Sequence, residues 1–591
     1  MKKRSTRLLA LLLAAVLSVC TLSCGTGQAP QAAKDEHERF TEFSEELFRS
    51  ELLGNTINLH YTLAYPEERG IDKYDIVLPT VSADSEKENY ADTRDVLAQL
   101  KDIDYKLLPE DDRLTYDVLE EYLETALEGE DFYYFYEPFS PIMGFQSNFS
   151  ITLAEYTFRR ERDVQDYLAI LELMPAYVDS LITLEKTRSK MGYAMPDSTI
   201  DDVFESIQEF LNAGENNIFL TSFEERLEKL EELSDSEKTE YVKKNREILE
   251  GQIIPSYKKI GRCLQEVRGT AKNTQGLCHT EGGEEYYAYL LKSMVGSGHT
   301  PEEMLALIED QIQQDLTEMM MIMSRSPDLL DGFDGIIPED RTPEDILDYL
   351  KDAMKEDFPE LPVEATYQIK YVPEYMEEST SPAFYMTPPY DLPNENTIYI
   401  NNSSTDESSL FSTLAHEGYP GHLYQMVYAS AAFSNPIRSL LSYLGYSEGW
   451  GLYVEHESYA MNDKLTSQSE DLAKLYRLNS SISIAVHALI DLEIHYNGSS
   501  PEDVRGLLTG YFGDLGEEAV QELYDMIVSE PAYYLKYYGG YLEFLLLRDK
   551  AERQLEEKFN LKEFHKFLLD MGPCAFPTIE NYMDNWIKKQ K

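Results

Sequence analysis

Positive charge is scarce in this sequence of 591 residues. It contains 52 lysines and arginines against 108 aspartates and glutamates, which gives a formal net charge of −56. A surface with that surplus of negative charge repels a phosphate backbone, so nucleic-acid binding is excluded as a function. Cationic and neutral partners remain open.

Cysteine, tryptophan and long apolar runs are also rare. The chain has five cysteines and two tryptophans, and beyond its first residues no segment has the apolar length of a membrane span. With 42% hydrophobic and 27% charged residues, it is typical of a globular protein with a substantial core. Cys263 and Cys278 lie close enough in sequence to form a disulfide, although nothing in the sequence shows that they pair. Cys574 is expected to be a buried thiol.

The first 23 residues resemble a bacterial lipoprotein signal peptide. Four basic residues precede an apolar stretch from Leu8 to Val19, and small residues with Cys24 follow. We expect cleavage before Cys24, a lipid on that cysteine and a linker over residues 24–36. The protein would then be anchored to the membrane outside the cytoplasm. Ordinary secretion, with Cys24 lost or inert, is the alternative.

Helix signals dominate the rest of the chain. Thr300, Thr342 and Ser500 each precede a proline and two acidic residues, an arrangement that is typical of a helix N-terminus. Residues 224–250 are highly charged but carry leucines at helical spacing, which predicts one long, half-exposed helix.

Strand patterns are few. Alternating polar and apolar residues at 365–372, and the segment 397–401, are the clearest. No repeat and no internal linker is visible. We therefore predict a mostly α fold with a small antiparallel β element, in one domain over residues 37–591.

Two histidines and a glutamate form the most specific motif. His416, Glu417 and His422 lie within seven residues, although the chain has only ten histidines. Zinc peptidases commonly place two histidines four residues apart on a helix, with a glutamate beside the first. Here the spacing is six, which on a regular helix rotates the second ring by about 240° and prevents both rings from binding one ion. Pro420 has no N–H for a helix and has glycines close to it, so we predict a broken turn that returns His422 to His416. Two histidines that satisfy polar groups at a kinked helix end are the alternative.

A second acidic segment follows. Glu448 and Glu455 are seven residues apart, so they lie on one face of a helix. Two histidines and one carboxylate would give a metal three protein ligands and leave a fourth position for water, as in catalytic zinc sites. We assign Glu448 as the third ligand and Glu455 as a residue that orients a ligand histidine. A solvated acidic stripe is the alternative, but the Gly-Trp-Gly sequence between the two acids is not typical of an exposed surface.

The segments 415–422 and 447–453 together resemble the bacterial domain-of-unknown-function family 885 (DUF885). That family in turn resembles the gluzincin metallopeptidases, which include the carboxypeptidase Taq and thimet-oligopeptidase types. The likeness covers most of the mature chain. It implies a helical fold around a deep cleft, with Zn²⁺ bound by His416, His422 and Glu448, and with Glu417 as general base.

The resemblance also points to two residues nearer the C-terminus. Tyr537 matches a tyrosine in a proline-to-glycine segment, whose hydroxyl would donate to the oxyanion formed when water attacks a carbonyl. Its neighbour Tyr538 is the alternative. His495 is a second candidate donor, and a hydrogen-bonded core histidine is the alternative role for it.

These assignments predict a zinc-dependent peptide hydrolase, an exo- or oligopeptidase with peptide substrates. The strand at 397–401 is expected either to pair as an edge strand with an extended substrate or to brace the histidine helix. Three other functions stay open: a lipid-anchored peptide- or solute-binding lipoprotein, an inactive peptidase-like protein, and a zinc amidase that acts on non-peptide amides. The sequence defines neither the oligomeric state nor the end of the substrate that is cleaved.

Overall fold

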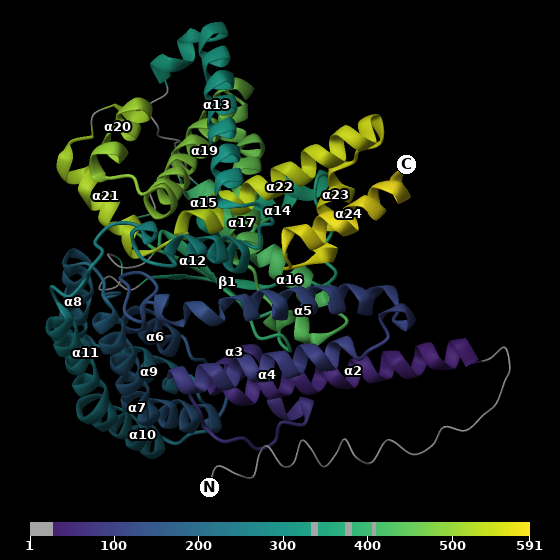
Figure 1. Cartoon of the computed structure of the whole chain (residues 1–591). Helices are drawn as coiled ribbons and strands as arrows, with labels where there is room; N and C mark the ends of the chain where they lie inside the picture. Colours follow the sequence, from purple (N-terminus) through teal and green to yellow (C-terminus); the bar gives the residue numbers. More distant parts are fainter. Residues whose placement is uncertain (1–27, 333–340, 373–376, 378–380, 405–408, 514) are drawn as a thin grey trace.

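Helices make up most of the computed structural model, which describes residues 28–332, 341–372, 377, 381–404, 409–513 and 515–591. Figure 1 shows the helices gathered around one small sheet. The predicted mostly α fold is confirmed. The predicted signal peptide and Cys24 lie outside the described residues.

The α-helices of the first half are α2 Gln28–Gly54, α3 Thr56–Thr62, α4 Ala83–Lys101, α5 Glu110–Glu128, α6 Phe145–Ala154, α7 Glu161–Met191, α8 Asp197–Asn212, α9 Ile218–Glu228, α10 Asp235–Ile248, α11 Ile254–Val267 and α12 Gly283–Leu290. Those of the second half are α13 Pro301–Arg325, α14 Pro343–Ala353, α15 Leu410–Glu417, α16 His422–Ala432, α17 Leu444–Met461, α18 Asp463–Thr466, α19 Glu470–Leu492, α20 Pro501–Phe512, α21 Glu517–Ser529, α22 Tyr533–Leu555, α23 Leu561–Met571 and α24 Phe576–Gln590. The strands are β1 Tyr367–Tyr371, β2 Ala383–Met386 and β3 Asn396–Ile400.

The three predicted helix starts are confirmed. Thr300, Thr342 and Ser500 cap α13, α14 and α20, and each hydroxyl accepts a hydrogen bond from the backbone N–H three residues later. The acidic residue at that position accepts a hydrogen bond from the backbone of the capping residue, which completes a capping box.

The prediction of one long helix over residues 224–250 was wrong. α9 ends at Glu228 and α10 begins at Asp235, because Ser234 and Glu237 form a capping box that starts a new helix. Leu230 and Leu233 in the intervening turn are buried, so the leucine spacing reflected core packing rather than one continuous helix. At the N-terminus, residues 28–36, which we expected in a linker, are the first turns of α2.

The sheet is mixed rather than antiparallel. Its strand order is β1-β3-β2, with β1 parallel to β3 and β2 antiparallel to β3. The strand expected at 397–401 is therefore the central strand, not an edge, and every residue of β3 is buried. Since both of its sides are paired, it cannot pair with a further strand, and β2 is the edge next to α15, the helix of His416 and Glu417.

Two hydrophobic clusters make up most of the core. The larger combines residues from α2 to α5 with residues from α12 to the C-terminus, and the other lies within residues 139–267. Figure 1 shows helices α6 to α11 of the second cluster together on one side of the molecule. Cys263 and Cys278 are not paired, and Cys574 is a buried thiol whose pKa burial raises to about 12.

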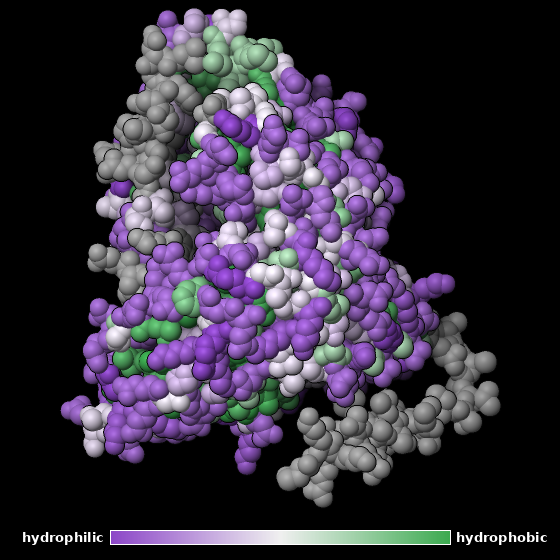
Figure 2. Space-filling view, turned by 60° about the vertical axis from the view of Figure 1, so that its left-hand side comes forward, coloured by the Kyte–Doolittle hydropathy of each residue, from purple (hydrophilic) through white to green (hydrophobic). Residues whose placement is uncertain are grey.

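One helix of the described structure, α7, is long and apolar enough to cross a membrane. It is a core helix of the second cluster, to which it contributes buried residues such as Val164, Leu168 and Leu171. On the face shown in Figure 2 the surface is mainly hydrophilic, with scattered apolar residues.

Helices α17 and α22 approach each other unusually closely through glycines. A Cβ atom on Gly540 would lie 2.0 Å from the backbone oxygen of Gly445, and one on Gly449 would lie 2.4 Å from the backbone carbon of Gly540. No side chain can enter this crossing without separating the helices. The crossing fixes the position of α17, which carries the second acidic segment.

Replacing Gly540 by alanine should therefore destabilise the protein by about 1–3 kcal/mol, because overpacking forces the two backbones apart. Gly506 is the matched control, since it lies in the middle of α20 and a Cβ atom added to it would have no neighbour within 4 Å. Gly506→Ala should raise stability by about 0.5–1 kcal/mol through helix propensity. Urea unfolding measures the free energy of unfolding of both variants. Equal effects of the two substitutions would contradict the close crossing.

Candidate metal centre

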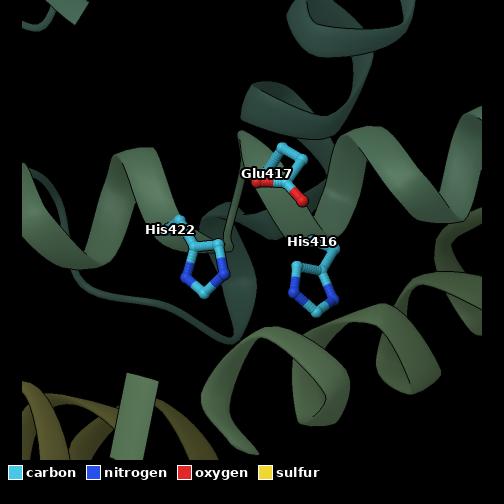
Figure 3. Close-up of side chains that lie close together, drawn as sticks. All are labelled: His416, Glu417 and His422. Carbon is cyan, nitrogen blue, oxygen red and sulfur yellow. The ribbon is translucent and has the colours of Figure 1, made fainter. Parts of the chain in front are cut away.

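The helix that carries the first histidine stops where the sequence predicts. α15 ends at Glu417 and α16 begins at His422, with residues 418–421 in a non-helical turn that contains a cis Tyr419–Pro420 peptide bond. A Cβ atom on Gly421 would lie 1.7 Å from the backbone oxygen of His416, so only glycine allows this return. Figure 3 shows the two imidazoles side by side, and their ring centroids are 4.8 Å apart. The predicted convergence is confirmed.

A tryptophan holds the turn in place. The indole N–H of Trp450 donates to the carbonyl oxygen of Pro420 over 2.9 Å, and its ring is fully buried. Trp450 lies on α17, so the same contact that fixes the turn also places α17 against it. Gly451 follows, and a Cβ atom there would lie 2.4 Å from Nε2 of His416. The Gly-Trp-Gly sequence thus makes room for the histidine.

Two of the three glutamates of α17, Glu448 and Glu455, face the histidines. Oε2 of Glu448 lies 3.6 Å from Nε2 of His416 and 3.6 Å from Nε2 of His422. Ligands of a tetrahedral zinc, at about 2.0–2.1 Å from the ion, are spaced by roughly 3.3 Å, so both of these separations are compatible with a single ion. Oε2 of Glu455 lies 3.0 Å from Nδ1 of His416, on the opposite side of that ring.

The charges of this cluster reinforce one another. Burial lowers the pKa of His416, but contacts with Glu448 and Glu455 outweigh it, and the net pKa is well above its usual value. For Glu448, burial raises the pKa, and the bonds to His416 and His422 outweigh it and hold the pKa of the carboxyl well below its usual range. A carboxylate held ionised beside two imidazoles has the chemistry of a cation site.

Glu417 is placed differently from the other acids. It is 8% exposed, its Oε2 atom has no hydrogen-bond partner among the described residues, and burial raises its pKa. The backbone N–H of Tyr385 in β2 supports its charged form. Donor atoms of His416, Glu417 and His422 all lie within 4.8 Å of one another (Figure 3). A buried carboxylate oxygen left without a partner beside a candidate cation site is suited to accept a proton.

The centre opens into a cleft of about 1170 Å³. Strand β2 and helices α15, α16, α17, α19 and α22 contribute to its walls. The candidate ligands His416, His422 and Glu448 line it, together with Glu417 and Glu455. The five residues that the sequence assigns to the centre are therefore brought together in one cavity.

Tyr537 also lines the cleft, and its ring centroid is 6.5 Å from that of His416. Tyr538 is fully buried, with its hydroxyl 3.4 Å from that of Ser481, and is not part of the cleft wall. Of the two tyrosines, Tyr537 is therefore the one that lines the cleft. Burial and the charge of Glu448 raise its pKa, so it remains a donor.

His495 does not belong to the cleft, so the prediction of a catalytic role is corrected. It is 1% exposed, its Nδ1 accepts the N–H of Leu277 over 3.2 Å, and its Nε2 donates to the carbonyl of Ile527 over 2.8 Å. Burial lowers its pKa to about 4, which keeps the ring neutral. Both nitrogens are occupied, and His495 is the hydrogen-bonded core histidine of the alternative.

Three features of the site could not be assigned from the sequence. The Trp450 bond to Pro420, the space left by Gly451 and the N–H of Tyr385 all join segments distant in the chain. The rarity of tryptophan and its place between two glycines were the signals available for the first two.

Comparison with protein families identifies the chain. A family model described as "Bacterial protein of unknown function (DUF885)" matches residues 66–583. The chain belongs to the DUF885 family. No curated protein matches it.

Two solved structures share the fold. One is a predicted lipoprotein from Colwellia psychrerythraea, with 19% identity, a TM-score of 0.79, and coverage of 94% of this chain and 99% of that one. The other is a predicted lipoprotein of unknown function from Shewanella oneidensis, with 17% identity, a TM-score of 0.63, and coverage of 92% and 99%. At these identities the likeness establishes a shared fold over nearly the whole chain.

A buried aspartate holds the start of α22, and it makes stability depend on pH. Asp491 accepts hydrogen bonds from the Tyr287 hydroxyl and from the backbone N–H groups of Ala532 and Tyr534, yet burial raises its pKa from 3.8 to about 7. At a pH between these two pKa values, the carboxyl group of Asp491 is protonated in the folded state and ionised in the unfolded state. The stabilisation that this proton gives the folded state is complete at a pH below the unfolded pKa and is lost as the pH rises through the folded pKa.

The unfolding free energy of the parent, relative to Asp491→Asn, should therefore decrease by a few kcal/mol as pH rises from about 4 to about 7, and then level off. The asparagine remains neutral throughout, so other titrations cancel in the difference. Urea unfolding from about pH 5.5 to about pH 8.5 covers about half of this change. A difference that does not vary with pH would show that Asp491 titrates at its ordinary pKa.

Proposed function

We propose that this DUF885 protein is a zinc-dependent peptide hydrolase of the gluzincin type. The observation that carries the proposal is the buried, unpartnered carboxylate oxygen of Glu417 beside three convergent donor atoms in a large cleft. If the histidines had only a structural role, the buried oxygen beside them would be expected to have a hydrogen-bond partner.

The donor set fits zinc. Two imidazole nitrogens and one carboxylate oxygen, from His416, His422 and Glu448, are the ligands of a catalytic site that keeps one position open. When bound, zinc supplies Lewis acidity that makes water acidic near neutral pH and polarises a carbonyl. Glu455 keeps Nδ1 of His416 engaged, so that Nε2 would be the ring nitrogen that binds the ion.

The remaining chemistry belongs to the side chains of the cleft. Glu417 takes a proton from the attacking water at its free Oε2 and passes it to the nitrogen of the departing amine. The Tyr537 hydroxyl donates to the carbonyl oxygen as negative charge develops on it.

Strand β2 is suited to hold the substrate backbone. It is an edge strand, residues 381–385 line the cleft, and its Tyr385 N–H lies against Glu417. An extended peptide that pairs with β2 would gain main-chain hydrogen bonds and lie across the catalytic carboxylate. This gives β2 the role that the sequence had suggested for residues 397–401.

We place the activity outside the cytoplasm, on a lipid anchor at Cys24. The N-terminal sequence supports this location, and both structural relatives are described as predicted lipoproteins.

Glu417→Gln should retain zinc but lower peptide hydrolysis by about 100-fold or more, because the amide cannot accept the proton. Zinc content by elemental analysis and cleavage of a mixed peptide library by mass spectrometry measure the two effects. Cleavage at the parent rate would refute the role of Glu417. Absence of zinc and of chelator-sensitive cleavage in the parent would refute the proposed function.

Glu455→Ala should weaken zinc binding by about 10- to 100-fold, because His416 loses the partner that orients its ring. Glu457→Ala is the control on the same helix, since its carboxylate pairs with Arg548 and lies outside the cleft wall. Competition with a zinc chelator gives both affinities. Equal affinities in the two variants would contradict the orienting role.

A further inference from the structure

The cleft continues beyond the candidate metal centre along one face of α16. Gln425, Ala429 and Ser430 line it, and Phe433 lines it just after the helix ends. These positions recur at helical spacing from His422. At ~1.5 Å per residue, Phe433 lies about 16 Å further along the helix axis than His422. An extended peptide of about five residues spans that length.

An arginine without an acidic partner lies at this far end. The Arg438 guanidinium is 4.8 Å from the ring centroid of Phe433, and the residue lines the cleft although it is only 3% exposed. One of its nitrogens donates to the carbonyls of Met571, over 2.6 Å, and Pro573, over 3.4 Å, but its Nε has no partner among the described residues.

That arrangement is unusual in this chain. Acidic residues outnumber basic ones by two to one, yet no carboxylate pairs with Arg438 anywhere in the described ranges. A buried guanidinium without a counter-charge is costly, so an anion that enters from the cleft would relieve it. The guanidinium fork matches a carboxylate in particular.

A second unpartnered group lies between Arg438 and the metal centre. Gln425 is 1% exposed, and neither its amide nitrogen nor its amide oxygen has a hydrogen-bond partner in the described structure. It follows His422 by three residues, about one helical turn. A peptide unit offers both a donor and an acceptor and can satisfy both atoms of this amide.

We propose that this end of the cleft binds the C-terminal carboxylate of an oligopeptide, with Arg438 as partner of the carboxylate and Gln425 as partner of a peptide unit nearer the centre. The inference rests on the proposed function and names its substrate class. Substrates are peptides with a free C-terminus, and the bond cleaved lies about five residues or fewer from that end.

The test compares peptides of one sequence that end in a free carboxylate or in a carboxamide. Binding is measured by calorimetry with the full mature Glu417→Gln protein, so it does not depend on turnover. We expect the amide to bind at least about 10-fold more weakly. A third peptide, amidated but with an aspartate near its end, separates a C-terminal carboxylate from a side-chain carboxylate. Equal binding of the acid and the amide overturns the inference, as does full recovery by the aspartate.

Substitutions show which side chain causes the preference for the free carboxylate. Arg438→Met should bring the ratio of acid to amide affinity close to one, whereas Arg226→Met should leave it unchanged. Arg226 is the matched control because it also donates to backbone carbonyls, those of Leu153 and Tyr156, but lies outside this cleft. If Arg438→Met does not fold, Gln425→Leu tests the site, and it should weaken binding of both peptides by at least about 10-fold. Unchanged ratios in Arg438→Met, or unchanged affinity in Gln425→Leu, overturn the inference.

Failure of the proposed function has a different signature. A parent protein that cleaves none of these peptides contradicts peptide hydrolysis, while a preference for the acid in the binding measurement still supports the carboxylate site. A parent that cleaves acid and amide with equal kcat/KM supports hydrolysis and contradicts the site.

Discussion

The interruption of the helix between Glu417 and His422 is the constraint on which the rest of the site depends. A spacing of six residues separates two imidazoles on any regular helix, and they converge only because Gly421 returns the backbone to within contact of His416. The turn is not a surface irregularity, because its Pro420 carbonyl accepts the N–H of a fully buried tryptophan. The packing of the core therefore determines the distance between the histidines.

Helix α17 meets three demands at once, which explains its composition. Gly451 admits the imidazole of His416, Gly449 admits the backbone of α22, and Gly445 admits the backbone of Val295. Glycine in a helix interior costs about 1 kcal/mol relative to alanine, and three in one helix would be unfavourable in isolation. Trp450, buried among aromatic rings that include Phe358 and Phe544, offsets part of that cost. Stability here comes from tertiary packing and not from helix propensity.

What the sequence could predict was local. Capping residues fixed three helix starts, and the spacing of His416, His422, Glu448 and Glu455 identified the centre, because each argument needs only one or two segments. The central position of β3 depends on pairing with two other segments, which no local pattern encodes.

The role of His495 was equally hidden, because its partners are the backbone groups of Leu277 and Ile527. Within residues 224–250, two local signals competed, and the capping box at Ser234 prevailed over the leucine spacing. Arg438 and Gln425 carry no motif, and only their unsatisfied polar atoms in the folded chain distinguish them.

The second hydrophobic cluster influences the cleft without lining it. No described residue from 139–267 contributes to its wall, but the backbone N–H groups of Ile142 and Met143 both donate to Glu530, which directly precedes the turn into α22. In that turn Ala532 has a φ of 62°, a left-handed conformation unfavourable for alanine, and Asp491 holds it through its N–H. The first two turns of α22 carry Tyr537 from there into the cleft. The position of the candidate oxyanion donor thus depends on two carboxylates, Asp491 and Glu530, and Glu530 also contacts the segment that contains the second cluster.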